Sequence, residues 1–240
     1  MQSPAAPPPL TLELAGQVAA QALDRLLNAV PGLHRSRPWM KRRETALIVE
    51  LLRHLTPRRC LEWGAGHSTL YFPRFMAPGG SWLSIEHDEA WGARVRSLCR
   101  DPRVRLEVVP PDRVPWSGPR NDGTAEDFRT YVGRPEAEGP FDFVLIDGRA
   151  RPACVEAALR MLAPGGAVLL HDAHRDIYRD AGATYRFRET FTDYRREIGG
   201  VWVGRNDAPV SEILDTARQR ALWSLARDLG RTSIGRLLRV

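Results

Sequence analysis

Lysine is almost absent from this sequence. Lys41 is the one lysine, and the rest of the 35 basic residues are arginine. This skew is typical of a genome-wide codon bias, because a phosphate-binding surface has no reason to exclude lysine. The arginines are also scattered, without a dense patch that carries interleaved aromatic residues. A net charge of +6 attracts polyanions in general, but we expect no specific nucleic-acid partner.

Long apolar runs and paired cysteines are absent too. No uncharged stretch approaches the ~20 apolar residues of a membrane-spanning helix, so no membrane span is expected. Cys60, Cys99 and Cys154 are odd in number and widely spaced, which argues against a disulfide framework or a structural zinc site. The first ten residues carry no basic residue, unlike a secretory signal. These absences predict a cytoplasmic protein.

Short apolar runs alternate with helical patterns along the middle of the chain. Candidate strands lie at 59–63, 81–86, 104–109, 141–146 and 166–170, and helical patterns lie at 68–75, 90–99 and 152–162. This alternation predicts βαβ units and a parallel sheet, and nearly all-apolar strands indicate that both faces are covered. A candidate antiparallel hairpin follows at 184–191 and 201–203.

The ends of the chain and one long insertion differ from this pattern. Helical periodicity marks 12–30, 41–55 and 211–238, and the polar stretch 110–140 predicts a short helix near 125–132. We therefore predict an N-terminal tail and helical extension over 1–56, a core over 57–207 and a C-terminal helical tail over 208–240. A length of 240 residues suits one sizeable core.

Two features at neighbouring strand ends point to a nucleoside ligand. Gly64 and Gly66 permit a sharp turn and a close backbone approach after the first strand. A dinucleotide fingerprint would place a third glycine where Thr69 stands. Glu86 ends the second strand, where an acid can accept hydrogen bonds from both ribose hydroxyls. The ligand is thus expected to need no pyrophosphate cradle, and S-adenosylmethionine meets that description.

Four motifs, in this order and spacing, resemble those of class I S-adenosylmethionine-dependent methyltransferases: LEWGAGHST, SIEHD, FDFVLIDG and LAPGGAVLLHD. The resemblance covers about residues 58–172 and is nearest to small-molecule and sugar O-methyltransferases. It implies a Rossmann-like three-layer α/β sandwich with a seven-stranded, mostly parallel sheet and an antiparallel last strand. The cofactor-binding residues that it implies are Glu62, Gly64, Ala65, Gly66, Ser68, Thr69, Glu86, His87, Asp112 and Asp147.

The candidate catalytic residues are Asp147, Asp172 and His174. The first ends the fourth strand, which the resemblance places against the methyl donor and the acceptor. The other two follow the fifth strand. An acceptor hydroxyl must lose a proton, which a nearby Asp or His can take. Asp172 and His174 are both open as that base, and we expect a small-molecule acceptor methylated at a hydroxyl group.

A metal requirement is not favoured. O-methyltransferases of the catechol type hold a divalent ion with acids at these two strand ends, followed by an asparagine. Asp147 and Asp172 match, but Ala173 stands at the asparagine position. Two carboxylates and His174 could still hold Mg²⁺, yet with one expected ligand missing no metal site is predicted.

Other functions remain as alternatives. Aminopropyltransferases share the sheet, but their glycine-rich turn carries further glycines and an aspartate. A methyltransferase-like binding module without turnover would act through the terminal helices at 10–27 and 213–238, although the intact glycine turn and Glu86 argue against a decayed cofactor site. The N-terminal helices are better suited to cover the acceptor cleft or to form a homodimer.

Overall fold

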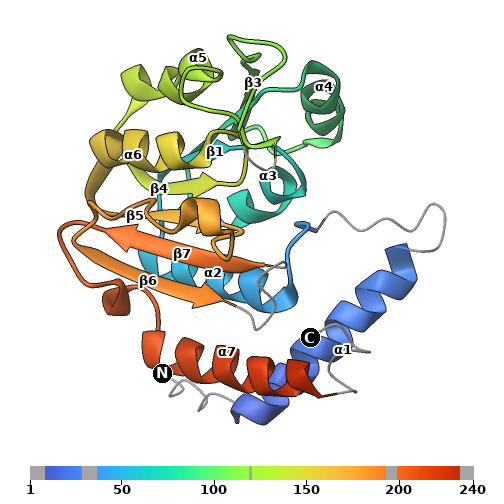
Figure 1. Ribbon diagram of the computed structural model, residues 1–240. Helices are drawn as coiled ribbons and strands as arrows, with labels where there is room; N and C mark the ends of the chain where they lie inside the picture. The colour runs from blue at the N-terminus through green and yellow to red at the C-terminus, as the bar shows by residue number, and fades with distance from the viewer. Residues whose placement is uncertain (1–8, 29–36, 119–120, 193–198, 233–240) are drawn as a thin grey trace.

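A seven-stranded sheet runs through the middle of the molecule in the order β3-β2-β1-β4-β5-β7-β6 (Figure 1). β7 is antiparallel to both of its neighbours, and the remaining neighbours pair in parallel. The predicted seven-stranded sheet with an antiparallel last strand is therefore confirmed. The strands are β1 (Arg59–Trp63), β2 (Ser81–Glu86), β3 (Val104–Val108), β4 (Phe141–Ile146), β5 (Leu162–His171), β6 (Phe187–Thr192) and β7 (Gly200–Arg205). The computed structural model describes residues 9–28, 37–118, 121–192 and 199–232.

The central strands are apolar on both sides because helices cover both faces of the sheet. In β4, Val144 and Ile146 belong to one buried cluster, whereas Phe143 and Leu145 belong to another. Alternate residues of a strand point to opposite faces, so these two clusters are the two halves of the core. All four side chains are fully buried.

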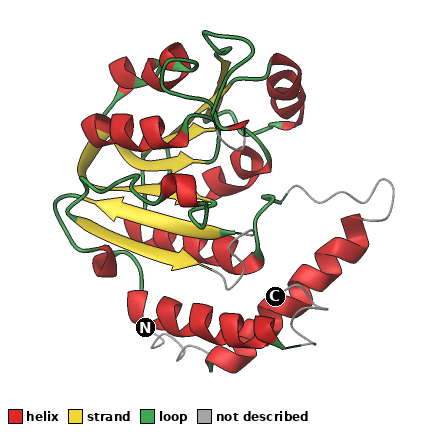
Figure 2. Cartoon of the chain, viewed as in Figure 1, coloured by secondary structure: helices red, strands yellow, loops and turns green. Residues whose placement is uncertain are grey.

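Helices form the outer layers (Figure 2). α6 packs on one face through residues such as Val155, and α2 packs on the other through residues such as Leu51. The helices are α1 (Leu10–Asn28), α2 (Arg42–Leu55), α3 (His67–Tyr71), α4 (Glu89–Leu98), α5 (Arg129–Gly133), α6 (Arg151–Met161) and α7 (Thr216–Arg231). Short 3₁₀ turns are η1 (Phe72–Phe75), η3 (Glu136–Glu138), η4 (Asp176–Tyr178) and η5 (Val210–Glu212).

Two local predictions differ from the structure. The helix predicted near 125–132 starts at Arg129, because the Asp127 carboxylate accepts hydrogen bonds from Thr124 and Ser117 and holds the preceding residues in turns. The predicted strand 166–170 begins earlier, at Leu162, where a register shift lets this residue pair with Phe141.

The terminal helices lie against each other. Leu14 of α1 is buried with Leu222 and Ala226 of α7, and Arg218 forms an ion pair with Glu13. The predicted helices at 12–30 and 211–238 extend beyond the described residues at 29–30 and 233–238. In the part of the chain that the structure describes, no helix has the length and apolar character needed to cross a membrane.

The sheet register brings four strand ends into one row. Trp63 pairs with Ile85 on one side and with Ile146 on the other, and Ile146 pairs with Leu170. The residues that follow them are therefore neighbours along the carboxyl edge of the parallel strands. In spatial order these residues are Glu86, Gly64, Asp147 and His171.

Candidate active site

The glycine turn begins at Gly64, whose backbone nitrogen donates to the carbonyl of Ile85 at 2.8 Å. Gly64 has φ +98°, and a Cβ there would lie 2.6 Å from the Cα of Gly148. Gly66 has an extended backbone with φ −178°, and a Cβ there would meet only Ser68 Oγ, at 3.9 Å. The predicted sharp turn thus depends on Gly64, whereas Gly66 leaves open space at the strand edge.

The Glu62 carboxylate is turned inward beneath this loop. It is fully buried and accepts hydrogen bonds from Ser68, Thr69, Trp82 and Ser84. Thr69 Oγ1 also accepts from the backbone nitrogen of Gly66 at 2.9 Å, so the network reaches the turn. Burial raises the pKa of Glu62 to about 7, although the four hydrogen bonds lower it in part.

Glu86 ends β2 beside the glycine turn and is 3% exposed. Its Oε1 accepts hydrogen bonds from the backbone nitrogens of His87 and Asp88, both at 2.9 Å. The Nδ1 atom of His87 lies 2.7 Å from the same oxygen. The ring of His87 makes edge contacts with Trp116 and Phe128. One oxygen of Glu86 is therefore anchored within its own loop.

Two other predicted cofactor residues lie at the margins of this row. The carbonyl oxygen of Ala65 accepts a hydrogen bond from Trp91 Nε1 at 2.7 Å, which places an indole over the glycine turn. Asp112 is exposed, and its carboxylate accepts hydrogen bonds from the backbone and hydroxyl of Thr130 in the first turn of α5. Asp112 is thus tied to α5.

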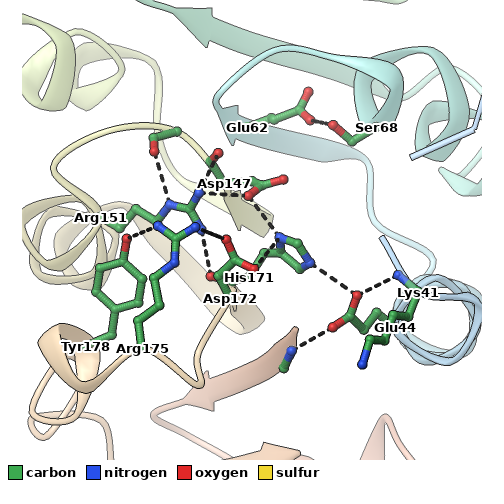
Figure 3. Close-up of polar contacts among 12 residues, drawn as sticks. Lys41, Glu44, Glu62, Ser68, Asp147, Arg151, His171, Asp172, Arg175 and Tyr178 are labelled. Carbon is green, nitrogen blue, oxygen red and sulfur yellow. Dashed lines mark hydrogen bonds and ion pairs between the residues drawn. The ribbon is translucent and has the colours of Figure 1, made fainter. Parts of the chain in front are cut away.

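Asp147 and His171 meet at the adjacent ends of β4 and β5 (Figure 3). His171 Nδ1 lies 2.9 Å from Asp147 Oδ1, and Nε2 lies 3.3 Å from Glu44 Oε2 of α2. Burial alone would lower the pKa of His171, but the two carboxylates raise it well above its usual value. His171 is accordingly an imidazolium between two acids, which makes it unsuited to act as a base near neutral pH.

Arg151, the first residue of α6, lies at the centre of the charged groups (Figure 3). Its Nη2 is 3.1 Å from Asp147 Oδ1, and its Nη1 is 3.4 Å from Asp172 Oδ2. On the other side, its backbone nitrogen donates to Asp122 Oδ2 at 3.2 Å. Burial would lower the pKa of Arg151, but Asp147 and the other nearby groups raise it.

Asp172 follows β5 in a left-handed conformation, with φ +59°. Its carboxylate pairs with Arg175 as well as Arg151. Burial would raise the pKa of Asp172, but His171, Arg151, Arg175 and His174 lower it. Asp172 is therefore a weak base at neutral pH.

A pocket of about 350 Å³ begins at Ala173, the residue after Asp172, and is lined by the segment that links β5 to β6 and by residues of β5, β6 and β7. Its walls carry polar and aromatic groups that are suited to hold a small organic molecule. The lining residues are Leu170, Ala173, His174, Arg175, Asp176, Tyr178, Arg179, Thr190, Thr192 and Trp202. Of the predicted catalytic residues, His174 is the one on this wall.

A divalent metal does not fit these residues as they stand. Among the described residues, Asp147, His171 and Asp172 offer ligand atoms within 4.8 Å of one another, a spacing that could hold an ion. Arg151 already contacts both carboxylates, and both ring nitrogens of His171 face carboxylates. The position between the two acids is thus filled by an arginine.

Some residues of this cluster were missed by the sequence analysis. Glu44 could have been noticed as an acid among the apolar residues of a predicted helix, and it is 1% exposed. Asp122 belongs to the long polar stretch and carries no local signal, although its carboxylate accepts a hydrogen bond from the hydroxyl of Tyr178 at 2.8 Å. Arg151 was not among the predicted site residues.

The comparisons with known proteins concern the family and the fold. Residues 61–173 match a family model described as a methyltransferase domain. No curated protein matches the sequence. A solved methyltransferase structure from Geobacter sulfurreducens is 17% identical with a TM-score of 0.50, and the match covers 85% of this chain and 93% of that chain.

Two further solved structures are similar. One, from Klebsiella pneumoniae and named as a candidate O-methyltransferase, is 17% identical with a TM-score of 0.52, with 85% of this chain and 93% of that chain covered. An O-methyltransferase from Bacillus cereus in complex with SAH is 20% identical with a TM-score of 0.49, with 84% and 93% covered.

The family match begins within β1 and ends just beyond β5, so it contains the whole row of strand ends and the glycine turn. The seven strands and the antiparallel last strand are those that the resemblance implied. Residues 61–173 are thus similar to a methyltransferase domain, and the chain shares its fold with solved methyltransferase structures.

Proposed function

We propose that this protein transfers the methyl group of S-adenosylmethionine to a hydroxyl group of a small molecule or sugar. The observation that carries the proposal is the placement of Glu86 directly beside the glycine turn. Gly64 donates to the carbonyl of Ile85, the residue before Glu86, at 2.8 Å. A ribose held by this carboxylate would therefore lie beside the open backbone at Gly66.

The cofactor would be held from both sides of the glycine turn. The hydrogen bonds described for Glu86 all reach Oε1, so Oε2 is the oxygen that we assign to the ribose hydroxyls. Gly66 leaves room for the methionine end, and Asp147 would lie near the sulfonium, which supplies an electrophilic methyl group. The loops on either side would contribute Ala65, His87 and Asp112.

Glu62, Ser68 and Thr69 have a different role in this proposal. Their side chains bind one another beneath the turn, and both oxygens of Glu62 are engaged by internal donors. They would set the shape of the loop and act on the cofactor through its backbone. This role is indirect. To contact the cofactor themselves, these side chains would have to give up the hydrogen bonds that they make to one another.

The acceptor is assigned to the pocket beside Asp172. A volume of about 350 Å³ matches the lower range of small-molecule sites. As the new O–C bond forms, the acceptor hydroxyl must release its proton, and His174 on the pocket wall would take it. Asp172 is the less suitable base, because its carboxylate pairs with Arg151 and Arg175 and its pKa is lowered.

The remaining parts of the proposal concern surroundings and assembly. A cytoplasmic location would keep Cys60, Cys99 and Cys154 reduced, consistent with their state as free thiols. A homodimer would use the outer side of α1, where Leu12 and Leu26 are exposed.

Calorimetric titration with S-adenosylmethionine and S-adenosylhomocysteine tests the proposal. We expect micromolar affinity, and a loss of about tenfold or more in Glu86→Ala, roughly 1.4 kcal/mol. Glu89→Ala is the matched control, because Glu89 is an exposed acid three positions away. Absence of binding by folded wild-type protein would contradict the proposal and favour a domain without turnover that acts through α1 and α7.

A further inference from the structure

We propose that Arg151 is the resident cation of this active site, occupying the position where a divalent ion would bridge Asp147 and Asp172, and that methyl transfer here needs no metal. The role assigned to the site rests on the proposed function. The identity of its cation does not, because metal binding can be measured without the cofactor or an acceptor.

Two acids and a histidine of this site have the spacing of an ion site. Asp147, His171 and Asp172 present ligand atoms within 4.8 Å of one another. Three such groups at adjacent strand ends would be a reasonable cage for Mg²⁺ or Mn²⁺ if they faced a common empty space. Negative charge gathered in this way requires a cation to compensate it.

Arg151 supplies that cation through all of its guanidinium nitrogens. Nη2 lies 3.1 Å from Asp147 Oδ1, and Nη1 lies 3.4 Å from Asp172 Oδ2. The same nitrogens donate to the carbonyls of Asp147 and His171 at 3.2 and 2.8 Å, and Nε donates to the carbonyl of Gly148 at 3.0 Å. A guanidinium keeps its charge at every physiological pH and binds planar oxygen pairs. The bridge is thus permanent.

The arginine is also built into the protein interior. Its side chain is 7% exposed, and the guanidinium carbon lies 5.7 Å from the ring centroid of Tyr178. Asp122, itself 3% exposed, pairs with the backbone and the side chain of Arg151. By contrast, Arg149 donates to a ring nitrogen of His87, at 3.4 Å. Arg151 is therefore a buried positioning residue of the site and not an arginine exposed at its edge.

Entry of a divalent ion would require this arginine to leave. An ion between the two acids would lie next to the buried guanidinium of Arg151. Two positive charges in direct contact repel each other strongly in the protein interior. If the arginine moved aside, its charge would lose three carboxylate partners. With Arg151 in place, Asp147 and Asp172 are instead held at a constant separation beside the pocket.

The test is a titration of the wild-type protein with Mn²⁺ alone, followed by calorimetry and by the electron paramagnetic resonance signal of the free ion. We expect no stoichiometric binding at millimolar Mn²⁺, and unchanged affinity for S-adenosylmethionine after treatment with EDTA. The proposal would be overturned if the wild type bound Mn²⁺ stoichiometrically and Asp147→Asn abolished that binding. If S-adenosylmethionine failed to bind both before and after EDTA treatment, the proposed function would be contradicted. The result of the Mn²⁺ titration would still stand.

A gain-of-binding variant provides the second arm. Arg151→Met together with Asp122→Asn removes the guanidinium and one of the three carboxylates that it neutralises, and leaves the ligand groups Asp147, His171 and Asp172 unaltered. We expect this double variant to bind Mn²⁺ at least tenfold more tightly than wild type, and Arg149→Met to bind no better than wild type. A folded double variant without such a gain would show that Arg151 does not stand in the ion's place. If it fails to fold, the wild-type titration decides.

Discussion

Glu44 and His171 are 127 positions apart, yet His171 Nε2 lies 3.3 Å from Glu44 Oε2 in the interior. Glu44 also accepts hydrogen bonds from the backbone nitrogens of Lys41, at 2.7 Å, and Gly200, at 2.6 Å. One carboxylate thus connects α2, β5 and the start of β7. Because His171 in turn contacts Asp147, α2 takes part in the electrostatics of the strand ends.

Glu44→Ala is expected to destabilise the protein by about 3–5 kcal/mol, because it leaves the His171 imidazolium buried without one of its partners. Burial would raise the pKa of Glu44, but His171 and the backbone donors lower it to about 2. Its stabilising contribution is therefore present above about pH 4.5 and is lost as the pH falls toward 2. Urea unfolding at pH 7 and pH 3 measures both effects.

Glu50→Ala on the same helix is the matched control for this substitution. Glu50 accepts hydrogen bonds from Asp215 and Gln219 at a partly exposed position, so we expect a loss of only about 1 kcal/mol. Equal losses in the two variants at pH 7 would show that the pairing with His171 has no special weight.

Glu62→Gln should change the pH dependence of stability in a different range. The folded-state pKa of Glu62 is raised to about 7, from 4.5. The folded state therefore binds the extra proton between these values, and wild-type stability declines as the pH rises from about 4.5 to 7, by an amount on the order of 3 kcal/mol. The variant lacks this titration. Parallel stability profiles of wild type and variant between pH 5 and 7 would contradict the assignment.

Gly64→Ala and Gly66→Ala should separate folding from cofactor binding. A Cβ at Gly64 would lie 2.6 Å from backbone atoms of Gly148, and φ there is +98°, so we expect destabilisation of several kcal/mol. A Cβ at Gly66 enters open space, so stability should change by less than about 1 kcal/mol while cofactor affinity falls. Thermal melts and calorimetry on the same samples provide the comparison. Unchanged affinity in Gly66→Ala would remove Gly66 from the cofactor site.

His174→Ala should lower kcat by roughly 10²–10⁴-fold, with cofactor affinity unchanged, if its imidazole takes the acceptor proton. The pH profile of the remaining kcat should lack the ionisation of the histidine. Asp180→Ala, an exposed position on the same segment, serves as the control. Normal turnover by His174→Ala would transfer the role of base to Asp172.

The local sequence pattern was sufficient for most of the fold. The bounds of β1, β2 and β4 agree with the predicted strands, because short apolar runs between turn residues identify strands that are buried on both faces. The glycine turn and Glu86 were likewise identified at strand ends, since the carboxyl ends of parallel neighbours lie at the same edge of the sheet. The family match over residues 61–173 spans the same local motifs.

What the sequence determined by itself is thus the position of most strands along the chain and the placement of the glycine turn, Glu86 and Asp147 at strand ends. Only the tertiary structure decided which charges are buried together. Arg151 meets Asp122 from the long insertion, and His171 meets Glu44 from a helix 127 positions earlier. A charged side chain is stable in the interior only beside opposite charges, and here those come from distant segments of the chain. Local sequence patterns do not predict such ion pairs, because the burial of a side chain depends on the assembled fold.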